Sequence, residues 1–394
     1  MDTEIKLVLK SGKDVSVLRR HPWIFSGAIK KIYGNPADGD LVKVYDNKDE
    51  YLATGHYQPG SIAVRILDFN NTEIDCAFWS DRILKALSLR KKLGLANSDE
   101  TNVYRLVHAE GDNLPGLIID YYNRHLVLQM HSAGMYRNAD VIVAALQQIY
   151  DGEIDTIFNK SEGTMPFKSP LKEENRFITG NAENTIVSEN NLKFRVDWTE
   201  GQKTGFFIDQ RQNRQLLQQY SRDKDVLNLF CYTGAFSVYA LAGNARSVHS
   251  VDSSAKAIDL VNENVGLNFT GKNHKDFAED AFKFLEHTKD KYDLIILDPP
   301  AFAKHQSALH NALQGYKRLN QSALENIRSG GILFTFSCSQ VVTKENFRKS
   351  VFAASVNAKR NVKILHQLTQ PGDHPVNIYH PEGEYLKGLV LYVE

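Results

Sequence analysis

Cys338 stands in a sequence context that suits a reactive thiol. The run FTFSCSQ, residues 334–340, places an apolar stretch typical of a buried strand directly before this cysteine. A lone cysteine usually packs as a small buried side chain, and by that rule Cys76 and Cys231 are expected to be structural. A cysteine at the end of a strand lies where the core gives way to a site, so Cys338 is a candidate nucleophile.

An acid followed by two prolines ends another apolar run, YDLIILDPP at residues 292–300. Two prolines cannot continue a central strand because they lack ladder donors, so they hold Asp298 where the chain leaves the sheet. The alternative is that the Asp-Pro-Pro segment forms only a turn and has no role in a site. The strand before Cys338 is expected to lie beside this one. A cysteine next to a carboxylate suits methylation at C5 of a pyrimidine. The thiolate of Cys338 would add to C6 and make C5 nucleophilic, while the carboxylate of Asp298 would hold the base edge.

The elements that must position these residues are short apolar strands alternating with helices, from about residue 205 onward. This alternation is typical of a Rossmann-like α/β fold, a parallel, doubly wound sheet. Two final apolar runs, 361–368 and 385–393, are predicted to close the sheet, the last one antiparallel. Ligands of such sheets bind beyond the carboxyl ends of the strands.

Acids follow three of the predicted strands, at Asp252, Asp280 and Asp298. Asp252 lies about 20 residues past the first turn, a spacing that suits a carboxylate accepting from ribose hydroxyls, with a helix N-cap as the alternative. The first turn, NLFCYTG at residues 228–234, lacks the G-x-G-x-x-G that a pyrophosphate requires. A nucleoside cofactor without phosphates fits better than NAD, and S-adenosylmethionine is the candidate.

Two other patterns precede this part of the chain. Residues 1–70 contain short alternating strands separated by turn residues, which predicts a small β-barrel. Residues 71–185 begin with a predicted helix over 78–93 and continue as an α+β domain with a small antiparallel sheet. The third domain, 186–394, is led by a hairpin with its turn at Asn190-Asn191.

The composition excludes several classes of protein. No apolar run is long enough for a membrane span, and the first residues lack the pattern of a signal peptide. Three cysteines indicate neither a disulfide framework nor a zinc site, so a metal-free protein of the reducing cytoplasm is expected.

Lys+Arg and Asp+Glu both number 47, so net charge neither indicates nor excludes a nucleic-acid partner. Local basic and aromatic clusters are the candidates for RNA binding, with a solvated face as the alternative reading of each. They comprise Arg19, Arg20, Trp23, Lys30, Lys31, Lys304, Lys317 and Arg318.

Six segments together resemble one known family over nearly the whole chain. They are RRHPWIFSGAI (19–29), TEGQKTGFFIDQRQNR (199–214), VLNLFCYTGAFSVYA (226–240), LDPPAFAK (297–304), LFTFSCSQ (333–340) and DHPV with PEGEYLKG (373–388). The sequence resembles the bacterial large-subunit ribosomal RNA 5-methylcytosine methyltransferases. The resemblance implies an N-terminal PUA domain, a middle α+β domain and a Rossmann-like methyltransferase domain that uses S-adenosylmethionine.

The resemblance also implies roles for individual residues. Cys338 would be the nucleophile and Asp298 its partner on the base, while Asp252 would hold the ribose and Asp280 the adenine. The remaining cofactor-binding residues that it implies are Tyr232 and Gly234 in the first turn, and Lys203, Thr204, Phe206, Phe207 and Asp209 in a segment that closes over the cofactor.

One departure from related RNA cytosine methyltransferases concerns product release. Many have a second cysteine beside the Asp-Pro-Pro segment, where this chain has Ala301-Phe302, and no residue is assigned to remove the C5 proton. Methylation of uracil C5 or of a guanine nitrogen stays open, as does a non-catalytic RNA-binding or assembly role. The target nucleotide and a homodimer also stay open.

Overall fold

The chain folds into two compact units. The computed structural model describes residues 5–165 and 174–394. The first unit comprises Met1–Val187, Val196–Ile208 and Gly372–Gly383, and the second comprises Ser188–Arg195, Asp209–Pro371 and Glu384–Glu394. The three-domain division with boundaries at 70 and 185 stays a prediction. A single cut near residue 186 does not reproduce the compact units, because two later segments pack with the N-terminal residues.

The N-terminal part of the first unit is a six-stranded sheet of order β2-β6-β5-β4-β1-β3. Its core is aliphatic and includes Leu7, Val44 and Val64, each with no exposed surface. The short helix α1 (Val15–Leu18) follows the first strand. The strands are β1 (Lys6–Leu9), β2 (Trp23–Phe25), β3 (Ile29–Tyr33), β4 (Leu41–Tyr45), β5 (Tyr51–Tyr57) and β6 (Ile62–Asp68).

The second sheet of the first unit has the order β11-β10-β9-β8-β7. The prediction of a purely antiparallel sheet is wrong, because β9 and β10 are parallel. Two helices, α3 (Ala133–Arg137) and α4 (Ala139–Tyr150), connect these strands, and such a crossover returns the chain in the same direction. The strands are β7 (Val103–His108), β8 (Leu117–Tyr122), β9 (His125–Met130), β10 (Thr156–Asn159) and β11 (Arg176–Thr179).

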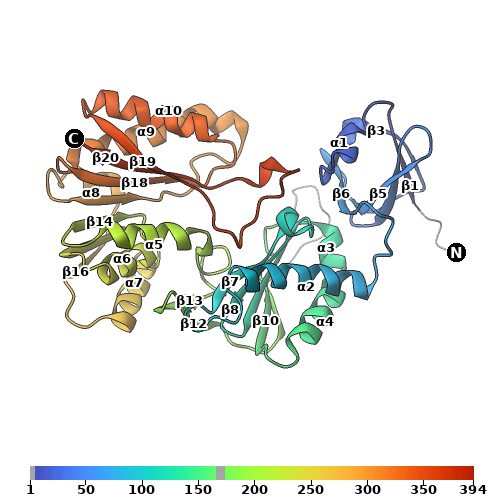
Figure 1. The fold of residues 1–394 in the computed structure, drawn as a ribbon, viewed down its shortest axis with the longest axis horizontal. Helices are drawn as coiled ribbons and strands as arrows, with labels where there is room; N and C mark the ends of the chain where they lie inside the picture. Colours follow the sequence, from blue (N-terminus) through green and yellow to red (C-terminus); the bar gives the residue numbers. More distant parts are fainter. Residues whose placement is uncertain (1–4, 166–173) are drawn as a thin grey trace. The chain divides into compact units, whose positions relative to one another are not determined.

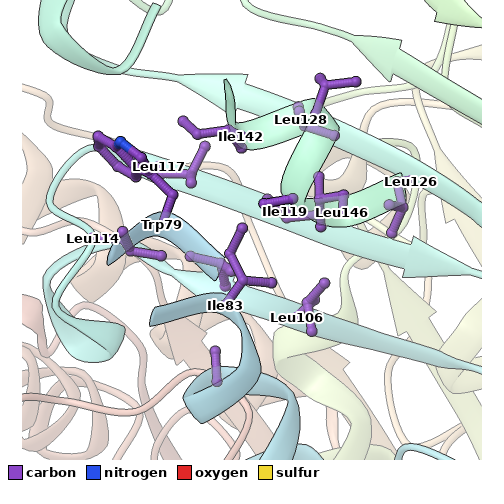
Figure 2. Packing of buried hydrophobic residues seen from close by; sticks show 14 of the residues in the cluster. Trp79, Ile83, Leu106, Leu114, Leu117, Ile119, Leu126, Leu128, Ile142 and Leu146 are labelled. Carbon is purple, nitrogen blue, oxygen red and sulfur yellow. The ribbon is translucent and has the colours of Figure 1, made fainter. Parts of the chain in front are cut away.

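The long helix α2 (Cys76–Lys92) packs with α4 on this second sheet. Figure 2 shows Ile83 of α2 and Ile142 of α4 facing strand residues such as Ile119. These side chains are fully buried, so each stabilises the fold by roughly 1.5–3 kcal/mol relative to an exposed position.

The second unit is built on a seven-stranded sheet of order β16-β15-β14-β17-β18-β20-β19. The first five strands in this order are parallel, and β20 runs antiparallel to both neighbours. This confirms the predicted doubly wound sheet, its antiparallel last strand and the adjacency of the strands before Asp298 and Cys338. The strands are β14 (Asp225–Leu229), β15 (Ser247–Asp252), β16 (His274–Ala278), β17 (Leu294–Leu297), β18 (Gly331–Ser337), β19 (Val362–Leu368) and β20 (Lys387–Val393).

Helices cover both faces of this sheet (Figure 1). One face carries α5 (Arg211–Tyr220), α6 (Ala235–Ala242) and α7 (Ala255–Asn268), and the other carries α8 (Ala281–Leu285), α9 (Leu309–Asn326) and α10 (Lys344–Asn357). Because both faces are covered, a central strand such as β17 is apolar throughout and fully buried. Over the described residues, every helix is too short or too polar to cross a membrane.

The predicted hairpin is present as β12 (Asn184–Glu189) and β13 (Leu192–Asp197). Asn190 and Asn191 have φ values of 51° and 65°, in the left-handed region that a two-residue type I′ turn requires at both positions. Asparagine adopts this region more readily than most residues, which is why the turn could be predicted from the sequence.

Candidate active site

The turn between β14 and α6 has an unusual backbone. Phe230, Tyr232 and Gly234 have φ values of 57°, 46° and 76°. A Cβ atom added at Gly234 would lie 2.8 Å from a methyl carbon of Val261, so both the conformation and the space require glycine. The turn therefore lies tightly against α7.

Asp252 connects this turn to the end of β15. One carboxylate oxygen accepts from the backbone N–H of Tyr232 at 3.0 Å, and the other accepts from the N–H of Ser254 at 3.0 Å. Ser254, not Asp252, caps α7. The alternative of a helix N-cap is thus excluded, and the carboxylate is fixed at the carboxyl end of its strand. Each oxygen can accept a further hydrogen bond, as a ribose hydroxyl would donate.

Asp280 has a structural task of its own. It is the exposed N-cap of α8, and its carboxylate accepts from the backbone N–H groups of Phe282 and Lys283 at 3.0 and 3.1 Å. Its position after β16 matches the prediction from the sequence. Its contact with the adenine stays a prediction.

Asp298 is held by side chains that the sequence did not single out. The amide nitrogen of Gln210 donates to a carboxylate oxygen of Asp298 at 3.0 Å, and Asn213 donates to the amide oxygen of Gln210 at 2.6 Å. Gln210 is buried. The neighbouring Asp209, also buried, accepts from the hydroxyl of Tyr385 at 2.7 Å. The only signal for Gln210 was its place in a polar helix within a family motif.

Cys338 directly follows β18 and is half-buried. Leu297 pairs with Thr335 across β17 and β18, so the two strands end at the same edge of the sheet. The hydroxyl of Ser339 donates to the carbonyl of Ala303 at 2.6 Å, which joins the segment around Cys338 to the one that follows Asp298. The predicted neighbourhood of these two motifs is therefore present in the fold.

Two further polar side chains approach the Cys338 segment. Tyr316 of α9 accepts from the hydroxyl of Ser337 at 2.9 Å, and its pKa is raised to about 12, mainly by burial and further by negative charge at Cys338. The ammonium of Lys387 donates to the carbonyl of Ser339. Burial lowers the pKa of Lys387 to about 8, and negative charge at Cys338 opposes that shift. Only Lys387 had a sequence signal, as part of PEGEYLKG.

The other two cysteines differ from Cys338. Cys231 is buried as expected, and burial raises the pKa of its thiol well above the ordinary value. The expectation that Cys76 is buried filler is wrong, because Cys76 is the first residue of α2 and is exposed at the helix start.

The GQKTGFF segment, residues 201–207, belongs to the first unit, whereas Asp209 belongs to the second. The hydroxyl of Thr204 donates to Asp120 at 2.7 Å and lies 3.0 Å from the hydroxyl of Tyr122, while the ammonium of Lys203 lies 4.8 Å from the ring centre of Phe207. Phe206 is buried. The predicted contacts of these residues with a cofactor stay predictions.

The basic candidates for RNA binding are mostly exposed. Arg19, Arg20, Lys30 and Lys31 are exposed in the first unit, and Lys304, Lys317 and Arg318 are exposed or half-exposed in the second. Trp23 is half-buried: its indole N–H donates to Glu110 at 2.8 Å, and its ring centre lies 4.3 Å from that of His380. The tryptophan is thus partly occupied by contacts within the first unit, and its role in RNA binding stays a prediction.

Comparisons with known proteins agree with this geometry. Residues 172–376 match the family model described as S-adenosylmethionine-dependent methyltransferase, and residues 7–69 match a PUA-like domain. The chain is 42% identical to Ribosomal RNA large subunit methyltransferase I of Tolumonas auensis over 97% of this chain and 98% of that one. It is 38% identical to the protein of the same name from Escherichia coli over 99% of both chains.

Solved structures give the same result. A Streptococcus mutans protein described as a SAM-dependent methyltransferase superposes with a TM-score of 0.83 at 26% identity, covering 98% of this chain and all of that one. A second solved structure, described as a methyltransferase complexed with SAH, superposes with a TM-score of 0.85 at 26% identity. It covers 98% of this chain and all of that one. S-adenosylmethionine is therefore the cofactor, as the strand-end acids and the glycine-poor first turn predicted. The chain belongs to the family of S-adenosylmethionine-dependent methyltransferases, together with the ribosomal RNA large subunit methyltransferases I.

Proposed function

We propose that this enzyme methylates C5 of a cytosine in large-subunit ribosomal RNA, with Cys338 as the nucleophile. The observation that carries the proposal is the position of this half-buried thiol at the end of β18, joined through Ser339 and Ala303 to the segment that follows Asp298. The names of the curated relatives support ribosomal RNA as the substrate class.

The proposed chemistry begins with the thiolate of Cys338. A bond forms between its sulfur and C6 of the base, and the electron pair of the C5–C6 double bond makes C5 nucleophilic. S-adenosylmethionine, when bound, supplies the electrophilic methyl group that C5 takes up. Loss of the C5 proton to a base and departure of the thiolate from C6 then restore the ring.

Other side chains of this chain would hold the reactants. The carboxylate of Asp298, itself held by Gln210, would accept from the exocyclic amino group of the base, because that edge of cytosine is a donor. Asp252 would accept from the ribose of the cofactor. A carboxylate facing the amino group favours cytosine over uracil, whose corresponding edge is an acceptor.

The first test removes the sulfur. Cys338→Ala should retain affinity for S-adenosylmethionine and for RNA, because it deletes one small group. It should lose nearly all turnover, since the carbon nucleophile is too weak without the covalent adduct. Cys231→Ala, which removes a buried sulfur outside the proposed mechanism, should cost only about 1 kcal/mol of stability and keep activity. A Cys338→Ala enzyme with ordinary turnover would contradict the proposal.

A second test traps the adduct. RNA that contains 5-fluorocytosine cannot lose a proton from C5 after methyl transfer, so the protein–RNA adduct should accumulate as a shifted band on a denaturing gel. The band should require S-adenosylmethionine and Cys338. Mass spectrometry of the methylated nucleoside separates the alternatives: methylated uracil or guanine would replace the cytosine assignment, and absence of any methylation would favour a non-catalytic RNA-binding role.

A further inference from the structure

Lys387 lies on the strand next to the Cys338 segment. It is the first residue of β20 and pairs with Ser337 across the antiparallel strands. Its ammonium donates to the carbonyl of Ser339, so the side chain extends along the segment that contains Cys338 between those two serines. Only 5% of Lys387 is exposed.

Within the described residues Lys387 forms no ion pair with a carboxylate. Glu384 acts on it electrostatically, but the carboxylate of Glu384 lies 2.9 Å from the ammonium of Lys344 instead. A buried ammonium is costly to maintain unless an opposite charge compensates it. The negative charge that a thiolate at Cys338 would carry is of the required sign and acts on Lys387.

We propose that Lys387 is a positioning residue whose ammonium stabilises the thiolate of Cys338 before it adds to the base. This inference rests on the proposed nucleophilic role of Cys338 and deepens it. A cation beside a cysteine favours the ionised thiol, as in other reactive cysteines. In this step the S–H bond breaks, the proton leaves to solvent and Lys387 remains protonated.

Other charged groups surround this pair. The hydroxyl of Tyr316 accepts from the hydroxyl of Ser337, and burial, together with negative charge at both Cys338 and Asp298, raises the pKa of Tyr316. Negative charge at Asp298 would oppose ionisation of Cys338. The positive charge of Lys344 lowers the pKa of Lys387, whereas Glu384 raises it. Lys387 is a cation whose side chain bonds directly to the Cys338 segment, which makes it the group to test.

The test measures ionisation of the thiol, not catalysis. The rate of alkylation by iodoacetamide is followed against pH in full-length protein carrying Cys76→Ser, which removes the exposed cysteine. Cys338→Ala in the same background defines the residual signal from the buried Cys231. The midpoint for Cys338 should lie below the ordinary value of about 8.5.

Three variants separate charge from packing. Lys387→Met keeps an unbranched apolar stem and should raise the midpoint by about one pH unit, lowering the alkylation rate at pH 7 about tenfold. Lys387→Arg should restore most of the shift. Lys363→Met is the matched control, because it removes an exposed lysine from the opposite end of the same sheet, and it should leave the midpoint unchanged.

The outcomes are distinguishable from those for the proposed function. An unchanged midpoint in Lys387→Met, with affinity for S-adenosylmethionine retained, overturns the inference even if methylation is lost. In the Cys76→Ser protein that retains Lys387, an alkylation midpoint for Cys338 at or above about 8.5 also overturns the inference. This result does not depend on whether the Lys387 variants fold. If Cys338→Ala still methylates RNA, the nucleophile proposal fails, whatever the alkylation profile shows.

Discussion

At the scale of single residues, the candidate site contains carboxylates that the protein holds in fixed orientations. Asp252 accepts from two backbone N–H groups, and Asp298 accepts from a buried glutamine. Such bonds fix the carboxylates before any ligand arrives, so little ordering remains to be done on binding. The same bonds make these acids sensitive to substitution.

Asp252→Asn should weaken binding of S-adenosylmethionine by roughly 10- to 100-fold. The change removes the charge from an acceptor, and hydrogen bonds to charged groups contribute roughly 1.5–3 kcal/mol each. Isothermal titration calorimetry on the full chain measures the effect. Asp259→Asn is the control, because it changes an exposed acid of the helix α7 that follows Asp252, and this variant should bind S-adenosylmethionine normally. Equal affinities for the two variants would contradict the role of Asp252.

At the scale of elements, the turn from β14 into α6 brings the first strand end close to α7. Its left-handed residues let the chain reverse within a few positions, and Asn264 of α7 donates to the carbonyl of Thr233 at 2.8 Å. Gly234 is the position where α7 leaves no space for a side chain. The geometry of the turn therefore depends on one glycine.

Gly234→Ala should destabilise the protein more than Gly271→Ala. Both glycines are left-handed, with φ values of 76° and 70°, but an added Cβ meets Val261 at 2.8 Å in the first case and nothing within 4 Å in the second. Backbone strain is thus common to both variants, and the difference should be about 1–3 kcal/mol from overpacking. Urea denaturation of the full chain measures this difference in the free energy of unfolding. Equal midpoints for the two variants would show that α7 moves to accommodate the added methyl group without cost.

At the scale of the whole molecule, charge is balanced, with 47 basic and 47 acidic residues. The proposed function therefore requires RNA affinity from local clusters, because counterion release depends on the cations that contact phosphates and not on net charge. The exposed cations of the N-terminal sheet are the first candidates. Hydrogen bonds from Trp23 and Arg65 to Glu110 tie that sheet to the rest of the first unit, so point variants are a cleaner test than deletion.

The combined variant Arg19→Ala, Lys30→Ala and Lys31→Ala should weaken RNA binding and flatten its salt dependence. The slope of log affinity against log salt should fall in magnitude by about 0.7–0.9 for each phosphate that these cations neutralise in the unsubstituted protein. Arg20 is left unchanged because its guanidinium lies 5.7 Å from the ring centre of Phe69, so its removal would also delete a contact within the first unit. Lys85→Ala, at an exposed lysine of α2 paired with Asp81, is the control. An unchanged slope would exclude this face as an RNA surface.

Local sequence signals determined many of the helices, strands and turns of this protein. Strands buried on both faces appear as uninterrupted apolar runs, so the parallel sheet of the second unit and the strand-end positions of Asp252, Asp298 and Cys338 could be predicted. The Asn190-Asn191 turn and helix α4 were equally evident, because backbone preference and apolar periodicity depend on neighbours a few residues away.

Only the tertiary structure decided which distant residues meet. The parallel pairing of β9 and β10, the bond from Gln210 to Asp298 and the bond from Lys387 to Ser339 all join positions far apart in sequence. No local pattern encodes such contacts, because they form when the burial of apolar surface closes the core and brings polar side chains to one sheet edge. Buried polar groups must then find partners among the groups nearby, and in this way Gln210 bonds to Asp298 and Lys387 bonds to the carbonyl of Ser339.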